Sequence, residues 1–140
     1  MNTCLDCRLS LYADDSALLF SHRDSRFIGN RLSHELAKCK QWLDDNKLSL
    51  HIGKTECLLF GSRRKLKGTE GFQVTCEGKV IDRVFCVKYL GVFLDSCLSG
   101  AAQAANVMKV CTGRLAFLYR NASLLDQNCR RLLCSALIQP

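Results

Sequence analysis

Two adjacent aspartates, Asp14 and Asp15, interrupt an apolar stretch and constrain the fold of the chain's first part more than any other feature. Leu9 and Leu11 alternate with polar residues before the pair, and the apolar run 17–20 follows it. Alternation of this kind is typical of strands, and Asp tolerates the positive φ that tight hairpins require. We therefore expect two short strands joined at Asp14-Asp15, with both carboxylates at the tip of the hairpin.

A long amphipathic helix is predicted next, over residues 24–45. Asp24 is a suitable N-cap, and apolar residues recur after it at spacings of three and four. These apolar residues are Ile28, Leu32, Leu36, Cys39 and Leu43. We expect the helix to end near Asn46.

The middle of the chain is β-prone. Short apolar runs separated by Gly or polar residues predict extended segments at 48–50, 56–60, 73–76, 79–81 and 84–94. A turn is expected at Glu77-Gly78, and Gly91 predicts a second hairpin or a bulge. The basic stretch 62–68 is expected to be a surface loop.

The last part of the chain is helical in pattern. Apolar residues at helical spacing predict helices over residues 101–119 and 126–137. We therefore expect an α+β fold, with an antiparallel sheet and one packed helix in residues 1–96 and a helical segment in residues 97–140.

Composition limits the class of protein. The 140 residues include 20 Lys and Arg against 13 Asp and Glu, a net charge of +7, which favours a polyanionic partner. No apolar run approaches the roughly twenty residues of a membrane-spanning helix, and the first residues do not read as a signal peptide. The ten cysteines are therefore expected in a reducing, intracellular setting, nucleus or cytoplasm.

The chemistry of Asp14 and Asp15 points to a metal ion. Two neighbouring carboxylates repel each other unless a cation lies beside them, and oxygen ligands on a tight turn suit Mg²⁺. Taken alone, however, an Asp-Asp pair is more often a solvated turn.

Asp14 and Asp15 belong to the first of three motifs that follow one another along the chain. Residues 12–15 read Tyr-Ala-Asp-Asp, residues 42–57 place Trp42 before a Leu-x-Leu piece and Lys54-Thr55, and residues 87–95 read Val-Lys-Tyr-Leu-Gly-Val-Phe-Leu-Asp. They resemble the C, D and E motifs of the reverse transcriptases of non-LTR (LINE-type) retrotransposons. The region after residue 100 resembles the start of their helical thumb, so the resemblance covers nearly the whole chain.

The resemblance implies a role for each matching residue. Asp14 and Asp15 match the metal-binding carboxylates of the palm, and Lys54 matches the lysine proposed to protonate the leaving pyrophosphate. Tyr12 and Ala13 match positions under the primer terminus and the incoming nucleotide. The residues that match the primer grip are Lys88, Tyr89, Leu90 and Gly91.

The family's reaction is RNA-templated DNA synthesis by two-metal nucleotidyl transfer. Its cofactor is Mg²⁺, and its partners are an RNA template, a DNA primer and deoxynucleoside triphosphates. The family's A motif, which supplies a further carboxylate, and its Gly-rich B motif are not found in this sequence. Asp6 lies on the strand that leads into motif C and does not replace the missing acid. We therefore expect the isolated chain to be inactive as a polymerase.

Two other interpretations stay open. The chain is alternatively a non-catalytic, basic nucleic-acid-binding remnant that uses the thumb-like helices and the basic loop, with Arg63, Arg64 and Lys65 as phosphate contacts. The third interpretation is a product without selected activity. Cys4-x-x-Cys7 has the spacing of half a zinc site, but no second half follows, so we favour two ordinary cysteines.

Overall fold

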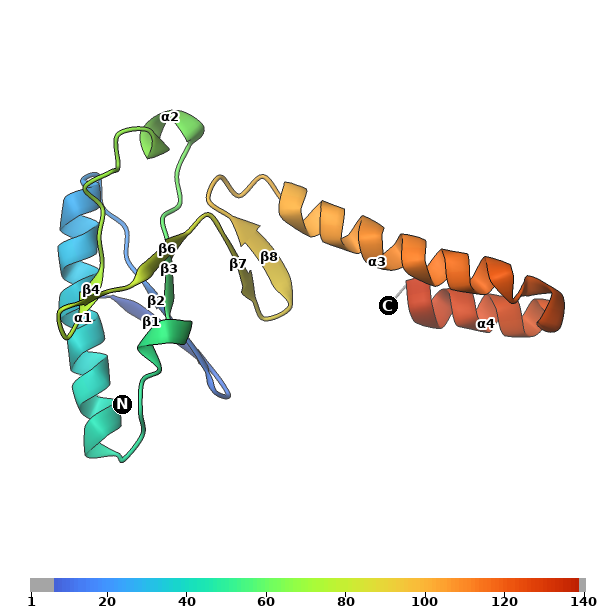
Figure 1. Ribbon diagram of the computed structural model, residues 1–140, viewed down its shortest axis with the longest axis horizontal. Coiled ribbons are helices and arrows are strands. Elements are labelled where there is room, and N and C mark those ends of the chain that lie inside the picture. The colour runs from blue at the N-terminus through green and yellow to red at the C-terminus, as the bar shows by residue number, and fades with distance from the viewer. Residues whose placement is uncertain (1–6, 139–140) are drawn as a thin grey trace. The chain divides into compact units, whose positions relative to one another are not determined.

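The structure is a computed structural model that describes residues 7–138 (Figure 1). These residues form two compact units with a boundary after Val87, here called the first unit (7–87) and the second unit (88–138). Helices and small two-stranded sheets together make the chain a member of the α+β class, as the sequence predicts. Cys4 and Asp6 lie outside the described residues.

The elements follow one another in a simple order. They are β1 (Arg8–Tyr12), β2 (Asp15–Leu19), α1 (Ser25–Asp45), the 3-10 helix η1 (Ile52–Lys54), β3 (Glu56–Leu58), α2 (Arg63–Leu66), β4 (Thr75–Cys76), β5 (Lys79–Val80), β6 (Asp82–Val84), β7 (Cys86–Tyr89), β8 (Val92–Asp95), α3 (Ala101–Arg120), the 3-10 helix η2 (Ala122–Leu124) and α4 (Gln127–Ile138). The three long helices and the three hairpins are confirmed, whereas residues 48–50 lie in no strand.

The strands form four separate pairs rather than one antiparallel sheet. The pairs are β1–β2, β3–β6, β4–β5 and β7–β8. The β3–β6 pair is parallel, with Cys57 opposite Arg83, so the expectation of an antiparallel sheet throughout is wrong. A parallel pair needs a long crossover, and residues 59–81 supply one.

The ends of α1 are set locally. Asp24 is the N-cap, and its side chain accepts a hydrogen bond of 2.9 Å from the backbone N–H of Arg26. Such a bond satisfies one of the donors that a helix leaves free at its start. At the other end, the Asn46 side chain donates to the Trp42 carbonyl at 2.8 Å, as the predicted terminator requires.

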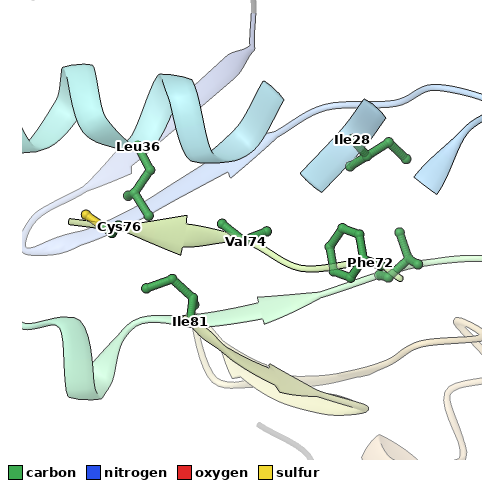
Figure 2. Packing of buried hydrophobic residues seen from close by; sticks show 7 residues of the cluster. Ile28, Leu36, Phe72, Val74, Cys76 and Ile81 are labelled. Carbon is green, nitrogen blue, oxygen red and sulfur yellow. The ribbon is translucent and has the colours of Figure 1, made fainter. Parts of the chain in front are cut away.

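The core of the first unit lies between α1 and the segment around β4. Figure 2 shows Ile28 and Leu36 of α1 directed toward Phe72, Val74 and Cys76. Ile81 closes the cluster from the other side and is 2% exposed. Removing these apolar side chains from water is the main force that holds α1 against β4.

One glycine allows α1 to approach this segment closely. A Cβ placed on Gly29 would lie 2.4 Å from the backbone oxygen of Gln73, a distance that no side chain tolerates. One turn later, the Ser33 hydroxyl donates to the Gly29 carbonyl and accepts from the Thr75 N–H, both at 2.8 Å. Backbone contact and hydrogen bonding thus fix α1 against β4.

The second unit is built from a hairpin and two helices. The Gln103 side chain of α3 accepts a hydrogen bond of 3.0 Å from the Phe93 N–H, which ties β8 to α3. Arg114 of α3 donates to the Leu137 carbonyl of α4. In this unit the only described apolar side chain that is fully buried is Leu118.

Asp95 organises the entry into α3. Its carboxylate accepts hydrogen bonds from the N–H groups of Cys97, Ser99 and Gly100, at 3.0 to 3.1 Å. The bond from the Ser99 backbone is the largest of the effects that hold the pKa of Asp95 below its usual value. The charged carboxylate therefore stabilises this turn.

Candidate functional site

The Tyr-Ala-Asp-Asp segment forms the tip of a tight hairpin. Tyr12 pairs with Asp15 across the β1–β2 ladder, so Ala13 and Asp14 are the two turn residues and Asp15 begins β2. The positive φ, 51°, is at Ala13, whereas the sequence analysis placed it on an aspartate. The reason is the register, because closing the ladder at Tyr12–Asp15 makes Ala13 the first residue of the turn.

All four residues of this tip face solvent. Asp14 and Asp15 are exposed, and the Tyr12 side chain is 65% exposed. Within residues 7–138 neither carboxylate forms an ion pair or accepts a hydrogen bond from a side chain. The hairpin therefore presents two adjacent charges that no cation in the described part of the chain neutralises.

The chemistry of these carboxylates suits Mg²⁺, but the set is incomplete. Mg²⁺ demands near-octahedral oxygen coordination, and a two-metal site needs carboxylates that hold both ions. Within the described residues no cluster of three or more His, Cys, Asp or Glu side chains lies close enough to hold a metal ion. The described part of the chain does not by itself fit the metal that the family uses.

Lys54 is the last residue of η1 and is exposed. The Lys54 N–H donates to the His51 carbonyl at 3.0 Å, and the Thr55 hydroxyl donates to the same carbonyl at 3.1 Å. These bonds fix the backbone on both sides of the lysine. Its ammonium group makes no ion pair with Asp14, Asp15 or any other acid among the described residues.

The residues that match the primer grip form the β7–β8 hairpin. Leu90 and Gly91 are its turn residues, with φ of 47° and 86°. Positive φ at both positions is typical of the type I′ turn that matches the twist of paired strands, and Gly91 adopts it without strain. The ammonium of Lys88 lies 5.9 Å from the centre of the Phe93 ring.

The candidate residues thus fall into both units of the molecule. Tyr12, Ala13, Asp14, Asp15 and Lys54 belong to the first unit, and Lys88, Tyr89, Leu90 and Gly91 to the second. Local turns account for the backbone of each group.

The basic segment is a single helical turn rather than a loop. Ser62 caps α2, its hydroxyl accepting a hydrogen bond of 3.3 Å from the Lys65 N–H. The expectation of a loop failed because Ser is a good N-cap and Arg, Lys and Leu are good helix formers. Arg63, Arg64 and Lys65 are all exposed, and none pairs with an acid among the described residues.

A buried charge cluster on α1 was missed by sequence reasoning. Glu35 is fully buried and contacts Lys38 at 3.1 Å, Arg31 at 3.4 Å and His34 at 3.4 Å. Burial alone raises the pKa of Glu35, but the hydrogen bonds from Lys38 and His34 and the nearby charges outweigh it and lower the pKa. The spacing Arg31-Glu35-Lys38 signals such pairs, yet it does not signal burial.

Arg83 is a second residue that sequence reasoning missed. Its guanidinium lies 5.3 Å from the centre of the Phe72 ring and 5.6 Å from that of Phe85. It also donates to the carbonyl and to the hydroxyl of Thr69, each at 2.8 Å. Phe85 is only two positions away, but no sequence signal links Arg83 to Phe72 and Thr69, because these contacts join β6 to a segment more than ten positions away.

Comparison of the chain with models of protein families, with curated proteins and with solved structures finds no match. Separately, none of the helices in the described part of the chain combines the length and the apolar character needed to cross a membrane.

Proposed function

We propose that the chain is the C-terminal part of the palm, with the start of the thumb, of a non-LTR retrotransposon reverse transcriptase domain. The observation that carries this proposal is the hairpin at Tyr12-Ala13-Asp14-Asp15, followed by α1. A two-strand hairpin that exposes two carboxylates and leads into a helix is the arrangement expected of motif C. The β7–β8 hairpin at Lys88-Tyr89-Leu90-Gly91 and helices α3 and α4 are compatible with the primer grip and the thumb.

In the proposed complete domain, Asp14 and Asp15 would be two of the carboxylates that hold Mg²⁺. When bound, the metal would supply activation of the primer 3′-hydroxyl and stabilisation of the leaving pyrophosphate. The hairpin's contribution is to hold two negative charges at a fixed position, whereas Lys54 offers a proton and a positive charge to the pyrophosphate. The remaining carboxylate has to come from a strand outside the described residues, so the described part does not extend a primer alone.

A segment exchange tests this proposal. Residues 7–100 replace the matching segment of an active reverse transcriptase of the same class, and primer extension on an RNA template is measured with Mg²⁺. We expect activity in the chimera and a loss of about a hundredfold or more in Asp14→Asn, because a charge that stabilises the reaction centre is removed.

The matched control is Asp82→Asn, an exposed aspartate of β6 that makes the same change of charge. Its activity should stay near that of the unchanged chimera. A folded chimera without activity, or one whose activity survives Asp14→Asn, would overturn the proposal.

One observation favours a second candidate function, non-catalytic binding of nucleic acid. Arg63, Arg64 and Lys65 present three exposed charges from one helical turn, on a chain of net charge +7. Cations that no acid neutralises are available to phosphates, and binding to phosphates weakens with salt because counterions are released. Fluorescence anisotropy with a labelled oligonucleotide between about 50 and 200 mM salt tests this function. Salt-independent binding, or no binding at low salt, would contradict it.

A further inference from the structure

Phe85 is an aromatic side chain held out to solvent. It follows β6 directly and is 67% exposed, although large apolar side chains gain free energy from burial. Arg83 contacts this ring, and its guanidinium lies 5.6 Å from the ring centre. The ring is therefore supported by the fold while most of its surface remains open.

A continuous set of contacts links this ring to the basic turn α2. The Arg83 guanidinium donates two hydrogen bonds of 2.8 Å to Thr69. The Thr69 hydroxyl in turn donates to the carbonyl of Leu66, the last residue of α2, at 2.8 Å. Thr69 is buried and the Leu66 side chain packs against the core, so the contacts between Arg83 and α2 pass through residues that the fold holds in place.

The segment that contains α2 is strongly positive. Residues 62–70 contain four cations, Arg63, Arg64, Lys65 and Lys67, against one acid, Glu70. All four cations are exposed. Together with Phe85, to which the contacts through Arg83 and Thr69 link α2, they form what we call the Phe85 surface. Among the described residues, none of the four cations forms an ion pair with an acid.

We propose that the Phe85 surface binds single-stranded nucleic acid, with phosphates on the four cations and one base stacked on the Phe85 ring. This inference rests on the second candidate function and adds to it a site and a strand type. Exposed aromatic rings and basic side chains are the two components that proteins combine to hold single strands. A base in a duplex already stacks on both faces, so a duplex cannot offer one to the ring.

Arg83 is a positioning residue in this arrangement. It contacts Phe85, Phe72 and Thr69 and is half-buried, so it holds the ring in place rather than contacting phosphate. The Phe72 ring, which also contacts the Arg83 guanidinium, is 5% exposed, which leaves Phe85 as the open member of the pair.

The test compares two oligonucleotides of equal charge, a labelled oligothymidylate and an abasic strand of the same length. The full chain should bind the strand with bases about fivefold or more tightly than the abasic strand, because stacking of one base contributes that much. Phe85→Leu should abolish this preference, and Phe85→Trp should restore it and show quenching of its indole fluorescence on binding.

A charge variant separates the two contributions. Replacing Arg63, Arg64 and Lys65 by Gln should weaken binding of both strands alike and reduce the salt slope by about 2, since each charge accounts for about 0.7 on a single strand. Tyr119→Leu, which removes an 85% exposed ring from the second unit, is the matched control and should leave the preference unchanged.

The outcomes separate the proposed Phe85 surface from nucleic-acid binding in general. No binding at low salt would refute nucleic-acid binding altogether. Salt-sensitive binding with no preference for bases, or a preference that survives Phe85→Leu, would overturn the Phe85 surface and leave the function standing. Tighter binding of a duplex of equal length would also overturn it.

Discussion

The two units of the molecule differ in how much of their apolar surface they bury. Among residues 7–138, the first unit contains nine of the ten buried apolar side chains, including Phe72, Val74 and Ile81, whereas the second contributes Leu118. In the second unit many large apolar side chains of the helical part remain 39% exposed or more. These are Val107, Met108, Val110, Leu115, Phe117, Tyr119, Leu124 and Leu132.

This difference shows that the helical spacing of apolar residues and the burial of those residues are separate properties. The apolar spacing of α3 predicts a helix, and a helix forms. The spacing on α1 predicts a helix equally well, and the apolar face of α1 packs into a cluster of buried residues around Phe72, Val74 and Ile81. Since most helix stability in proteins comes from packing, the second unit should be the less stable of the two.

The largest effect expected from this comparison is the loss of a core side chain. Ile81→Ala should lower the free energy of unfolding of the first unit by about 2 to 5 kcal/mol, because Ile81 is enclosed on all sides. Leu118→Ala should have a smaller effect, since Leu118 lies among exposed residues that can adjust. Urea denaturation followed by fluorescence of Trp42, the single tryptophan, reports on the first unit, and far-UV circular dichroism reports on all helices.

Equal effects of the two substitutions, or a larger effect of Leu118→Ala, would contradict the conclusion that the first unit has the better-packed core. Leu98→Ala is a suitable control, because this side chain is 62% exposed and its truncation should change stability little.

A pair of glycines gives the next largest effect, with opposite signs in the two units. Gly29→Ala places a Cβ against the Gln73 carbonyl and should destabilise the first unit by about 1 to 3 kcal/mol. Gly113→Ala meets no atom within 4 Å, so the better helix propensity of Ala should stabilise α3 by about 1 kcal/mol. Thermal melts of both variants, followed by circular dichroism, measure the signs, and a stabilising Gly29→Ala would show that α1 does not approach β4 so closely.

The smallest effect is expected on lowering the pH. The folded pKa of Glu35 in the first unit and of Asp95 in the second lies below the ordinary values of 4.5 and 3.8. A lowered folded pKa means that the charged form is favoured in the folded state. The stability from both groups is therefore present above these ordinary values and lost as the pH falls through the lowered ones.

Single substitutions of Glu35 and Asp95 measure how much each carboxyl group contributes to the loss of stability at low pH. Glu35→Gln should make the Trp42-detected unfolding less dependent on pH below about 4.5, and Asp95→Asn should do the same for the helix signal at lower pH. An unchanged pH profile in Glu35→Gln would show that the cluster around Glu35 contributes nothing to acid unfolding.

Local features of the sequence determined much of this protein. The Asp24 cap, the apolar spacing of α1 and the turn at Glu77-Gly78 were predicted because each depends on residues close together in the chain. Gly91 predicted a hairpin or a bulge on the same ground, and the structure has the hairpin. The hairpin at Asp14 and Asp15 was predicted on the same ground, although the register moved the positive φ to Ala13.

The tertiary structure alone decided what joins distant residues. Three features depend on which surfaces meet after folding. They are the parallel pairing of β3 with β6, the close approach of Gly29 to Gln73 and the contacts of Arg83 with Phe72 and Thr69. The burial of Glu35 belongs with them. Spacing along a chain specifies which face of a helix or strand is apolar. Only packing specifies what covers that face, because the burial of a side chain depends on the segment that packs against it.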